Sequence, residues 1–544
     1  MSVQLSELIP AERSGRLPSS AVPFWTSGAD GRLRVGRCPK CARLLHPEHE
    51  LCPTCGSEVD SVAVSGEATV VACTVNHQKW IPQLSEPYVV AVVALREDDT
   101  VRLATNIVGC EAVSVVVGLP VRVEFRRVAD VWIPLFRPSD EPPVSGAVPE
   151  PIVSVPPTPR GARFEHRVVL SGIGRSRIGR RLGVPDLDLV TDACTSAISD
   201  AGLSAADIDG LCAYPGTIDG SLGARQVGRE LSIEPTWYHG AHETPGQTGT
   251  VITAMMAVAA GLCRHVLCWS SVSTHRRPGL YSDDRDGRIH GEPQWYAPFG
   301  ALSPAHWIAL AASQYLARYR VSREALGWVA VAARRHAGLN PDALHRDQLD
   351  LDGYLAGRDI CTPFGIHDCD VPCDGAYAVV VSSTDTKDDL RHPQVRVDAV
   401  GTRITERQSW ISGTLTHQPN VFGPAAHLWS RASVGREDVD LATLYDGFTF
   451  NVLSWLEALG FCGPGEAGEF VTGADQITLG GALPINPHGG QLSAGRSNGY
   501  GQLHEAILQL RGQAGDRQVA DAQVAVVSSG GGIPANCMLL TAHR

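Results

Sequence analysis

The sequence predicts a mixed α/β protein in which a small, metal-bound, strand-rich region precedes a larger region of alternating strands and helices. Three observations support this prediction. Four cysteines form two Cys-x-x-Cys pairs near the N-terminus, a proline-rich segment divides the chain, and apolar strands alternate with helical stretches after that segment. At 544 residues the chain is too long for a single core, so we expect about two to four domains.

The first predicted element is a zinc ribbon over residues 36–60, after an N-terminal helical or irregular segment of residues 1–35. Its two knuckles, CPKC and CPTC, contain Cys38, Cys41, Cys52 and Cys55. Two such knuckles on facing turns place four thiolates at the corners of a tetrahedron, which is the geometry of structural zinc sites. Because all four ligands are cysteines, no position stays open for water, and we expect a structural zinc ion instead of a catalytic one.

Short β-rich runs follow over residues 61–137. They read ATVVACTV, YVVAVVAL, VRLATNIV and VRVEF, and turn-forming stretches such as REDDT separate them. Short strands at this spacing indicate a small closed or sandwich sheet, and five of them would suit an OB-type barrel. Residues 138–163 are a predicted linker, because eight prolines fall between Pro138 and Pro159 and favour an extended spacer.

The remaining chain alternates strands and helices in two passes. The first, residues 164–390, has the strand HRVVLSGIG, the buried helix TVITAMMAVAAGLC and the strands HVLCWSSV and AYAVVVSS. The second, residues 391–544, has the strand QVRVDAVG, the helix YDGFTFNVLSWLEALGF and two final strands joined by the glycine turn SSGGG. Two passes in the same order suggest a duplicated, doubly wound domain.

Composition argues against several classes of partner. The formal charge is -12 without a Lys/Arg-rich run, so we expect no nucleic-acid partner. The longest apolar run, VITAMMAVAAGLC, is too short to span a bilayer, and the N-terminus shows no apolar secretory region. We therefore expect a cytoplasmic protein without membrane insertion, in which the cysteines outside the ribbon are reduced thiols.

Motifs in both regions resemble known families. CPKC, CPTC, SGEATVVACTV, VGLPVRVEF and PLFRP resemble the zinc-ribbon/OB-fold proteins that accompany thiolase-like enzymes in acyl-CoA metabolism. DAGLSAADIDGL, CDGAYAVVV, LYDGFTFNVLSWLEALGFCGPGE, LPINPHGG and LQLRGQAGDRQV resemble the thiolase superfamily, particularly its sterol-carrier and lipid-transfer branch. The resemblance implies a five-layered αβαβα domain preceded by a zinc ribbon and a small OB-fold β-barrel. It also implies a homodimer, since thiolases pair through their central strands.

The catalytic groups of a thiolase are missing from the matching positions. The nucleophilic cysteine at a helix N-terminus would fall in HETPGQTG and the second cysteine in SSGGG, and neither stretch contains one. Arg496 replaces the histidine of the glycine-rich loop, and a guanidinium group cannot act as a base. Without a nucleophile no acyl-enzyme forms, so we do not expect cleavage by covalent thiolysis.

The glycine-rich loop PINPHGGQLSAGRSNGYG remains, and its N–H groups can stabilise the oxygen of a thioester enolate. The resemblance then narrows to the thiolase-like aldolases of steroid side-chain degradation, which work with a zinc-ribbon/OB-fold partner and in which tyrosines are the proposed catalytic groups. The matching motifs supply Tyr445 in LYDGFTF and Tyr500 in GRSNGYG. One tyrosine is expected to help remove the β-hydroxyl proton, and the other to protonate or hydrogen-bond the enolate. Tyr445, with Asp446 beside it, is the first candidate for proton removal, and the reverse assignment stays open.

Further residues are candidates for the same site. His488 precedes the Gly-Gly turn, and His242 lies in the stretch that replaces the thiolase nucleophile; a surface turn and a helix cap are the respective alternatives. The candidate residues for binding the acyl-CoA thioester are Gly489, Gly490, Gly495, Arg496 and Gly531. Cys369 and Cys373 have a Cys-x3-Cys spacing, but no second pair lies nearby to complete a metal site.

The sequence therefore predicts an aldehyde-lyase type aldolase. It would cleave a bulky β-hydroxyacyl-CoA thioester by a retro-aldol reaction to a ketone or aldehyde and a shorter acyl-CoA. Two alternatives stay open. One is a Claisen-type acyltransferase with an unrecognised thiol, for which Cys194, Cys212 and Cys462 are poor candidates on position. The other is a noncatalytic acyl-CoA or lipid carrier.

Overall fold

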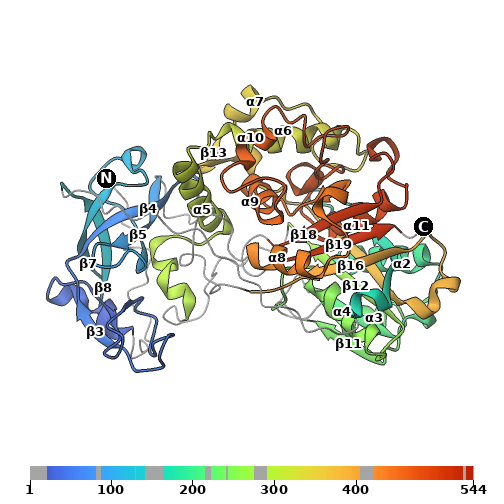
Figure 1. Cartoon of the computed structure of the whole chain (residues 1–544), viewed down its shortest axis with the longest axis horizontal. Helices are drawn as coiled ribbons and strands as arrows, with labels where there is room; N and C mark the ends of the chain where they lie inside the picture. The colour runs from blue at the N-terminus through green and yellow to red at the C-terminus, as the bar shows by residue number, and fades with distance from the viewer. Residues whose placement is uncertain are drawn as a thin grey trace.

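The protein has two lobes, which Figure 1 shows with helix α5 (Pro304–Tyr319) between them. The computed structural model describes residues 21–80, 87–128, 130–140, 163–214, 222–240, 243–274, 291–404, 421–530 and 535–542. Most of the predicted linker, together with His242 and Gly531, lies outside these residues.

The N-terminal lobe contains a three-stranded sheet and a five-stranded barrel. In the small sheet β1 (Arg34–Arg37) lies between β2 (Leu44–Leu45) and β3 (Asp60–Ala63). In the barrel β4 pairs with β5 and β7, β5 with β6, and β7 with β8. The barrel strands are β4 (Glu67–Asn76), β5 (Tyr88–Leu95), β6 (Arg102–Thr105), β7 (Pro120–Val128) and β8 (Val131–Pro138). The five strands expected for an OB-type barrel are confirmed.

The larger lobe is built on a nine-stranded mixed sheet with the order β11-β10-β12-β15-β9-β16-β19-β18-β17. In the first half β15 is antiparallel to both of its neighbours, β9 and β12, and β12 pairs in parallel with β10, which pairs in parallel with β11. In the second half β19 is likewise antiparallel to β16 and β18, and β18 pairs in parallel with β17. The predicted duplication is therefore confirmed by topology, and the second half lacks the edge strand among the described residues. The strands are β9 (Val168–Arg175), β10 (Gly210–Tyr214), β11 (Trp237–Gly240), β12 (His265–Val272), β15 (Gly375–Ser383), β16 (Val395–Gly401), β17 (Leu441–Thr443), β18 (Val524–Ser529) and β19 (Asn536–Ala542).

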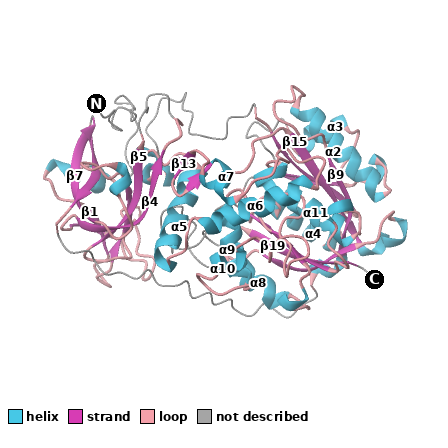
Figure 2. Ribbon diagram, turned by 90° about the horizontal axis from the view of Figure 1, so that it is seen from above, coloured by secondary structure: helices cyan, strands magenta, loops and turns pink. Residues whose placement is uncertain are grey.

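Helices separate and cover the two halves of this sheet, which gives five layers (Figure 2). α4 (Gly249–Ala259) and α11 (Tyr500–Leu510) share one apolar core with strands of both halves, so they form the middle layer. α4 carries no charged residue, as a helix enclosed between two sheet faces requires. The outer layers contain α2 (Asp186–Ala201) and α3 (Ala224–Glu230) on one side, and α8 (Phe422–Arg431) and α9 (Thr449–Leu459) on the other.

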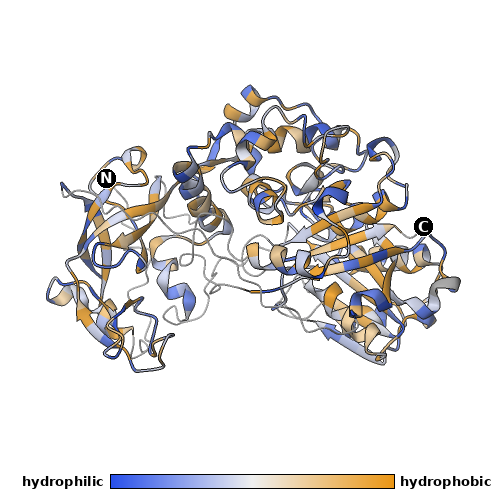
Figure 3. Ribbon diagram, in the orientation of Figure 1, coloured by the Kyte–Doolittle hydropathy of each residue, from blue (hydrophilic) through white to orange (hydrophobic). Residues whose placement is uncertain are grey.

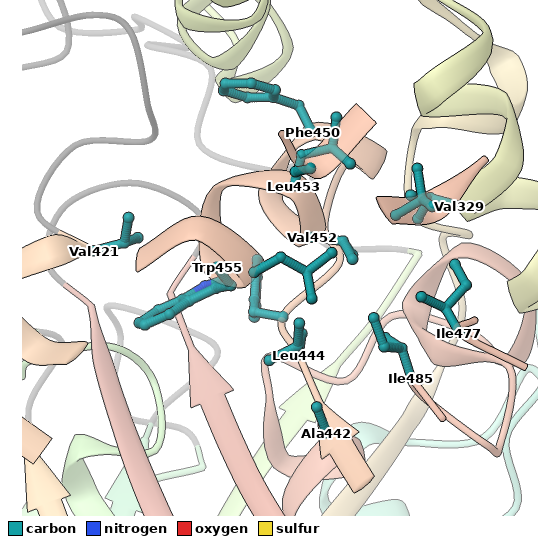
Figure 4. Packing of buried hydrophobic residues seen from close by; sticks show 14 of the residues in the cluster. Val329, Val421, Ala442, Leu444, Phe450, Val452, Leu453, Trp455, Ile477 and Ile485 are labelled. Carbon is teal, nitrogen blue, oxygen red and sulfur yellow. The ribbon is translucent and has the colours of Figure 1, made fainter. Parts of the chain in front are cut away.

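The strands of this lobe are mostly apolar, which Figure 3 shows in orange, because helices cover both of their faces. The largest core cluster surrounds α9, whose Phe450, Val452, Leu453 and Trp455 pack with Leu444 (Figure 4). This core anchors the loop between β17 and α9. It also includes apolar residues of α5, of α6 (Glu324–Gly338), of α7 (Leu351–Leu355) and of α10 (Ala467–Val471). Among the described residues, no helix combines the length and apolar character needed to cross a membrane.

The two lobes are joined by strand pairing and by aromatic packing. β13 (Asp359–Cys361) pairs with β4 at Cys361 and Asn76, and β14 (Phe364–Gly365) pairs with β13. Two strands from the larger lobe therefore extend the barrel sheet. Trp295 stacks on Trp25 of α1 (Val22–Trp25), with ring centroids 5.8 Å apart. The barrel sheet thus includes strands contributed by the α/β domain, although a predicted linker separates the two in the sequence.

Candidate active site

The four cysteines of the knuckles form a metal-binding cluster. One ligand atom from each of Cys38, Cys41, Cys52 and Cys55 lies within 4.8 Å of all the others. The Sγ atoms of Cys38 and Cys55 are 3.4 Å apart, and those of Cys41 and Cys52 are 3.5 Å apart. Four sulfurs about 2.3 Å from a central Zn²⁺ would be separated by about 3.8 Å, so the cluster fits a tetrahedral zinc. Cys369 and Cys373 take part in no such cluster among the described residues.

Tyr445 lies in the loop between β17 and α9. The sequence predicted a helix from this residue, but α9 begins only at Thr449. The Tyr445 N–H donates a hydrogen bond to Oγ of Ser528 in β18 at 2.8 Å, which holds the loop against that strand. A Cβ atom at Gly447 would stand 2.8 Å from Cε1 of the Tyr445 ring, so glycine there lets the ring fold over the backbone. Tyr445 is therefore a loop residue held in one position, instead of a helix residue.

The pKa of the Tyr445 hydroxyl is affected by one negatively and one positively charged side chain. Burial raises the pKa of the Tyr445 hydroxyl, and the negative charge of Asp370 raises it further. The positive charge of Arg496 and the side chain of Gln491 act in the opposite direction. Tyr445 is accordingly neutral near pH 7, with a cation close enough to stabilise its ionised form.

Asp446 holds the glycine-rich loop against the Tyr445 loop. Its buried carboxylate accepts hydrogen bonds from the N–H groups of Gln491 at 2.9 Å and Leu492 at 3.4 Å, and from Nε2 of Gln502 at 2.7 Å. Burial raises the pKa of Asp446 to about 7, against the effect of these donors. Gly490 adopts φ +60°, and a Cβ atom there would stand 1.8 Å from Oδ2 of Asp446. The structure gives Gly490 a packing role beside this carboxylate, and its expected contact with a ligand stays a prediction.

Hydrogen bonds to the side chain of Gln491 and the ion pair between Arg496 and Asp370 stabilise the conformation of the glycine-rich loop. Oε1 of Gln491 accepts hydrogen bonds from the N–H groups of Ser497 at 2.9 Å and Asn498 at 3.0 Å. Nε and Nη2 of Arg496 donate to the two carboxylate oxygens of Asp370, each at 2.7 Å. Asp370 raises the pKa of Arg496, which stays protonated. Arg496 is therefore a fixed cation whose positive charge acts on the Tyr445 hydroxyl.

Two other candidate binding glycines have backbone conformations that L side chains rarely adopt. Gly489 has φ +98°, and a Cβ atom there would stand 2.7 Å from the Cβ of Ala337 in α6. Gly495 has φ +126°, in contact range of Cys373. Glycine at both positions is thus explained by the fold of the loop, and their proposed contact with a ligand stays a prediction.

Tyr500 is the first residue of α11 and is fully buried. Its hydroxyl lies 2.6 Å from Oγ1 of Thr250 in the first turn of α4. Burial raises the pKa of Tyr500 well above its usual value, so it is a neutral hydrogen-bonding group. Tyr214, at the end of β10, adds slightly to the raised pKa of both Tyr445 and Tyr500.

The stretch before α4, where a thiolase would carry its nucleophile, holds a network of hydroxyl and amide groups. Oγ1 of Thr248 donates to Oδ1 of Asn536 at 3.0 Å, and the Thr248 N–H donates to Oγ of Ser529 at 3.2 Å. Oγ of Ser529 in turn donates to Oε1 of Gln247 at 3.0 Å. None of these groups is a strong nucleophile at neutral pH. The candidate residues His242 and Gly531 lie outside the described part of the chain.

His488 faces a different space from the two tyrosines. It lines a cavity of about 30 Å³ together with His504, Glu505 and Arg517, and neither Tyr445 nor Tyr500 lines that cavity. Burial lowers the pKa of His488 to about 4, so the imidazole is neutral at pH 7. Its backbone carbonyl accepts a hydrogen bond from Nδ2 of Asn340 at 2.9 Å. A catalytic role for His488 stays a prediction.

Sequence reasoning missed several residues that shape the site. Asp370, Gln491, Gln502 and Thr250 each form a hydrogen bond with a candidate residue, Gln491 from within the glycine-rich loop and the other three from positions distant in the sequence. Gln491 stood in the glycine-rich loop and could have been found, because an amide inside such a loop is placed to bond its N–H groups. The other three have no local signal, since their partners lie 56 to 250 residues away.

Comparisons with known proteins agree with this architecture. Residues 25–60 match the family "ChsH2, rubredoxin-like zinc ribbon domain", residues 61–126 match "ChsH2, C-terminal OB-fold domain", and residues 412–541 match "Thiolase C-terminal domain-like". Over 388 residues the chain is 32% identical to the steroid side-chain-cleaving aldolase of Thermomonospora curvata, an alignment that covers 69% of this chain and 98% of that protein. The chain belongs to the thiolase-like aldolase family.

Two further matches support this membership. The chain is 31% identical over 388 residues to the 17-hydroxy-3-oxo-4-pregnene-20-carboxyl-CoA lyase of Mycobacterium tuberculosis, covering 69% of this chain and 99% of that protein. The solved structure of the Ltp2-ChsH2(DUF35) aldolase matches with a TM-score of 0.64 and 32% identity, covering 70% of this chain and 98% of that chain. The expected thiolase-like fold, preceded by a zinc ribbon and an OB-fold domain, is confirmed in this aldolase.

Proposed function

We propose that this thiolase-like aldolase cleaves a β-hydroxyacyl-CoA thioester by a retro-aldol reaction. One observation carries the proposal: the chain aligns with named aldolases over nearly their whole length, while the helix start that would hold a thiolase nucleophile contains no cysteine. Loss of the nucleophile removes covalent thiolysis but leaves a site that can stabilise an enolate. A lyase acting on CoA thioesters is therefore the function that the residues support best.

The reaction proceeds without a covalent intermediate. A base removes the proton of the substrate's β-hydroxyl, and the bond between the α and β carbons breaks. The β carbon leaves as a ketone or aldehyde, and the electron pair of the broken bond moves into the thioester enolate. Protonation of the α carbon by the acid then yields the shorter acyl-CoA. The base is now protonated and the acid deprotonated, so transfer of one proton from the base to the acid, through solvent, restores the enzyme.

We assign the base role to Tyr445 and the acid role to Tyr500. Burial raises the pKa of both hydroxyls, but the positive charge of Arg496 opposes this effect at Tyr445, whereas the Tyr500 hydroxyl is hydrogen-bonded to Thr250. The minor phenolate form of Tyr445, stabilised by this positive charge, is the proton acceptor, and the neutral buried phenol of Tyr500 is the donor. Asp446 orients the loops that carry the two tyrosines through its three hydrogen bonds.

The substrate class, assembly and location follow from the same comparisons and from the fold. The names of the relatives favour a steroid-type acyl group with a bulky β carbon.

A homodimer is favoured by β11, which pairs only with β10 among the described residues and exposes 57% of Tyr238 at the edge of the sheet. An unpaired edge strand of this kind can pair with a second copy of the chain. The cytoplasm is the expected compartment.

The proposal is tested by mass spectrometry of the CoA products formed from a panel of β-hydroxyacyl-CoA esters, with and without a steroid nucleus. We expect a shortened acyl-CoA from wild-type protein and a loss of about 10² to 10⁴ in rate for Tyr445→Phe and Tyr500→Phe. Wild-type rates in both variants would refute the assignment of the tyrosines, and the absence of turnover over the whole panel would favour an acyl-CoA carrier.

The acyltransferase alternative is tested with iodoacetamide. Burial raises the pKa of Cys462 to about 12, and Cys194 and Cys212 are fully buried, so none of them is an activated thiol. We expect activity to survive labelling of the accessible cysteines. Complete inactivation through one labelled cysteine would instead support the transferase.

A further inference from the structure

Residues 359–371 connect the OB-fold barrel to the two loops of the active site. At the outer end of this segment Cys361 pairs with Asn76 of β4. The Thr362 N–H donates to the carbonyl of Val75 at 3.0 Å, and Oγ1 of Thr362 accepts from the Val75 N–H at 2.9 Å. The segment therefore begins as part of the barrel sheet.

The middle of this segment is bonded to the start of α9. The ring of Phe364 stacks on that of Phe448, with centroids 5.2 Å apart and planes 13° apart. The buried carboxylate of Asp368 accepts a hydrogen bond from Oγ1 of Thr449 at 2.6 Å and another from the hydroxyl of Tyr354 at 2.8 Å. Phe448 and Thr449 directly follow the Tyr445 loop, so this contact fixes one end of that loop.

The inner end of the segment lies between the Tyr445 loop and the glycine-rich loop and is bonded to both. The Asp370 N–H donates to the carbonyl of Gly447 at 3.0 Å, while its carboxylate holds Arg496 through two hydrogen bonds. Val371 exchanges backbone hydrogen bonds with the glycine-rich loop, donating to the carbonyl of Gln491 and accepting from the Arg496 N–H, each at 2.9 Å. A carboxylate that holds both N–H groups of a guanidinium fork fixes its plane as well as its distance.

We propose that residues 359–371 are a structural link through which the OB-fold domain holds the Tyr445 loop and the glycine-rich loop in register, with Asp370 as the positioning residue at its inner end. The barrel then serves catalysis by ordering the active site through this link. The inference deepens the proposed function and rests on it, because Tyr445 and Arg496 are positioned for proton removal. Asp370 itself acts through Arg496 and Gly447.

The first test uses Asp370→Asn in the full-length protein. Asparagine keeps the size of the side chain but cannot hold the guanidinium with two acceptors. We expect kcat to fall roughly 10- to 100-fold with KM changed less than about 3-fold, since small misplacements of catalytic groups have effects of this size. Removal of the negative charge also favours the ionised form of Tyr445, so the limb of the kcat–pH profile that reports this residue moves to lower pH. Asp370→Glu restores the charge and should return that limb toward the wild-type pH.

A matched control is Glu165→Gln. Glu165 is fully buried and also accepts two hydrogen bonds from one arginine, Arg431, with Nε at 2.9 Å, but this pair joins the start of β9 to α8. The control loses a buried ion pair of the same kind and should keep the wild-type pH profile. A wild-type kcat and pH profile in Asp370→Asn would overturn the proposal, as would the same profile shift in Glu165→Gln.

The second test measures the link without turnover. Thr362→Val removes the acceptor for the Val75 N–H, whereas Thr362→Ser keeps it. We expect amide hydrogen exchange of residues 445–449 and 491–498 to become at least about 3-fold faster in Thr362→Val and in Asp370→Asn than in Thr362→Ser. If wild-type protein cleaves no CoA ester, the proposed function fails, and unchanged exchange in both variants separately refutes the link.

Discussion

Replacement of Gly490 by alanine gives a direct test of how Asp446 shapes the site. The new Cβ atom would stand 1.8 Å from Oδ2 of Asp446, so the carboxylate must move and lose bonds to Gln491, Leu492 or Gln502. A buried hydrogen bond to a charged group contributes about 1.5–3 kcal/mol, so loss of two of them costs about 3–6 kcal/mol. The positive φ adds about 1 kcal/mol.

The matched control is Gly480→Ala. Gly480 also has a positive φ, +84°, but nothing lies within 4 Å of its added Cβ atom, so it bears only the backbone cost. With about 2.1 cal/mol/K of unfolding entropy per residue and roughly 380 residues in the thiolase-like part, 1 kcal/mol corresponds to about 1.3 °C in Tm. We therefore expect Tm to fall about 4–8 °C further in Gly490→Ala than in Gly480→Ala by scanning calorimetry, with kcat reduced about 100-fold only in Gly490→Ala. Equal Tm and equal kcat in the two variants would refute this account of the Asp446 contacts.

Three other perturbations have defined outcomes. Asp446→Asn removes a carboxyl whose folded pKa of about 7 lies above its usual value, so wild-type protein loses stability as the pH rises from about 4 to 7, and the variant should lose less. Tm measured across this range checks the prediction, and an unchanged slope of Tm against pH contradicts it. Thr250→Val removes the hydroxyl that forms a hydrogen bond with Tyr500 and should lower kcat about 10-fold. Thr253→Val removes a hydroxyl that donates to the Gly249 carbonyl within α4 and should leave kcat unchanged, so equal kcat values in the two variants would show that the Tyr500 contact is dispensable. Cys52→Ser should lower bound zinc below one ion per chain and lower Tm, while kcat falls less than about tenfold; an abolished kcat in a still folded variant would point to a catalytic zinc.

The sequence was most informative where function and fold depend on local patterns. The knuckles around Cys38 and Cys52 predict the zinc cluster because ligand spacing within a knuckle is fixed by one turn. The order of strands and helices predicted the duplicated sheet. The predicted helix start at Tyr445 was wrong. The apolar pattern of α9 continues into the preceding loop, where Leu444 and Tyr445 are buried in the core without being helical.

The contacts between lobes could not be predicted in this way. β13 has three residues, too few to show a period, and its partner Asn76 lies in another domain. The pairing of Trp25 with Trp295 likewise depends on a long-range encounter of two short segments. Such pairings are decided by tertiary packing, so the position of Asp370 between the Tyr445 loop and the glycine-rich loop could be found only in the structure.

Carbon–carbon cleavage without a cysteine nucleophile is tested most directly by turnover of a β-hydroxyacyl-CoA in D₂O, with no free CoA added. Protonation of an enolate by solvent-exchanged groups predicts a shortened acyl-CoA that carries one deuterium at its α carbon, formed by a protein whose intact mass stays unchanged. An absolute requirement for free CoA, together with an acyl group bound to a cysteine peptide, would contradict the mechanism.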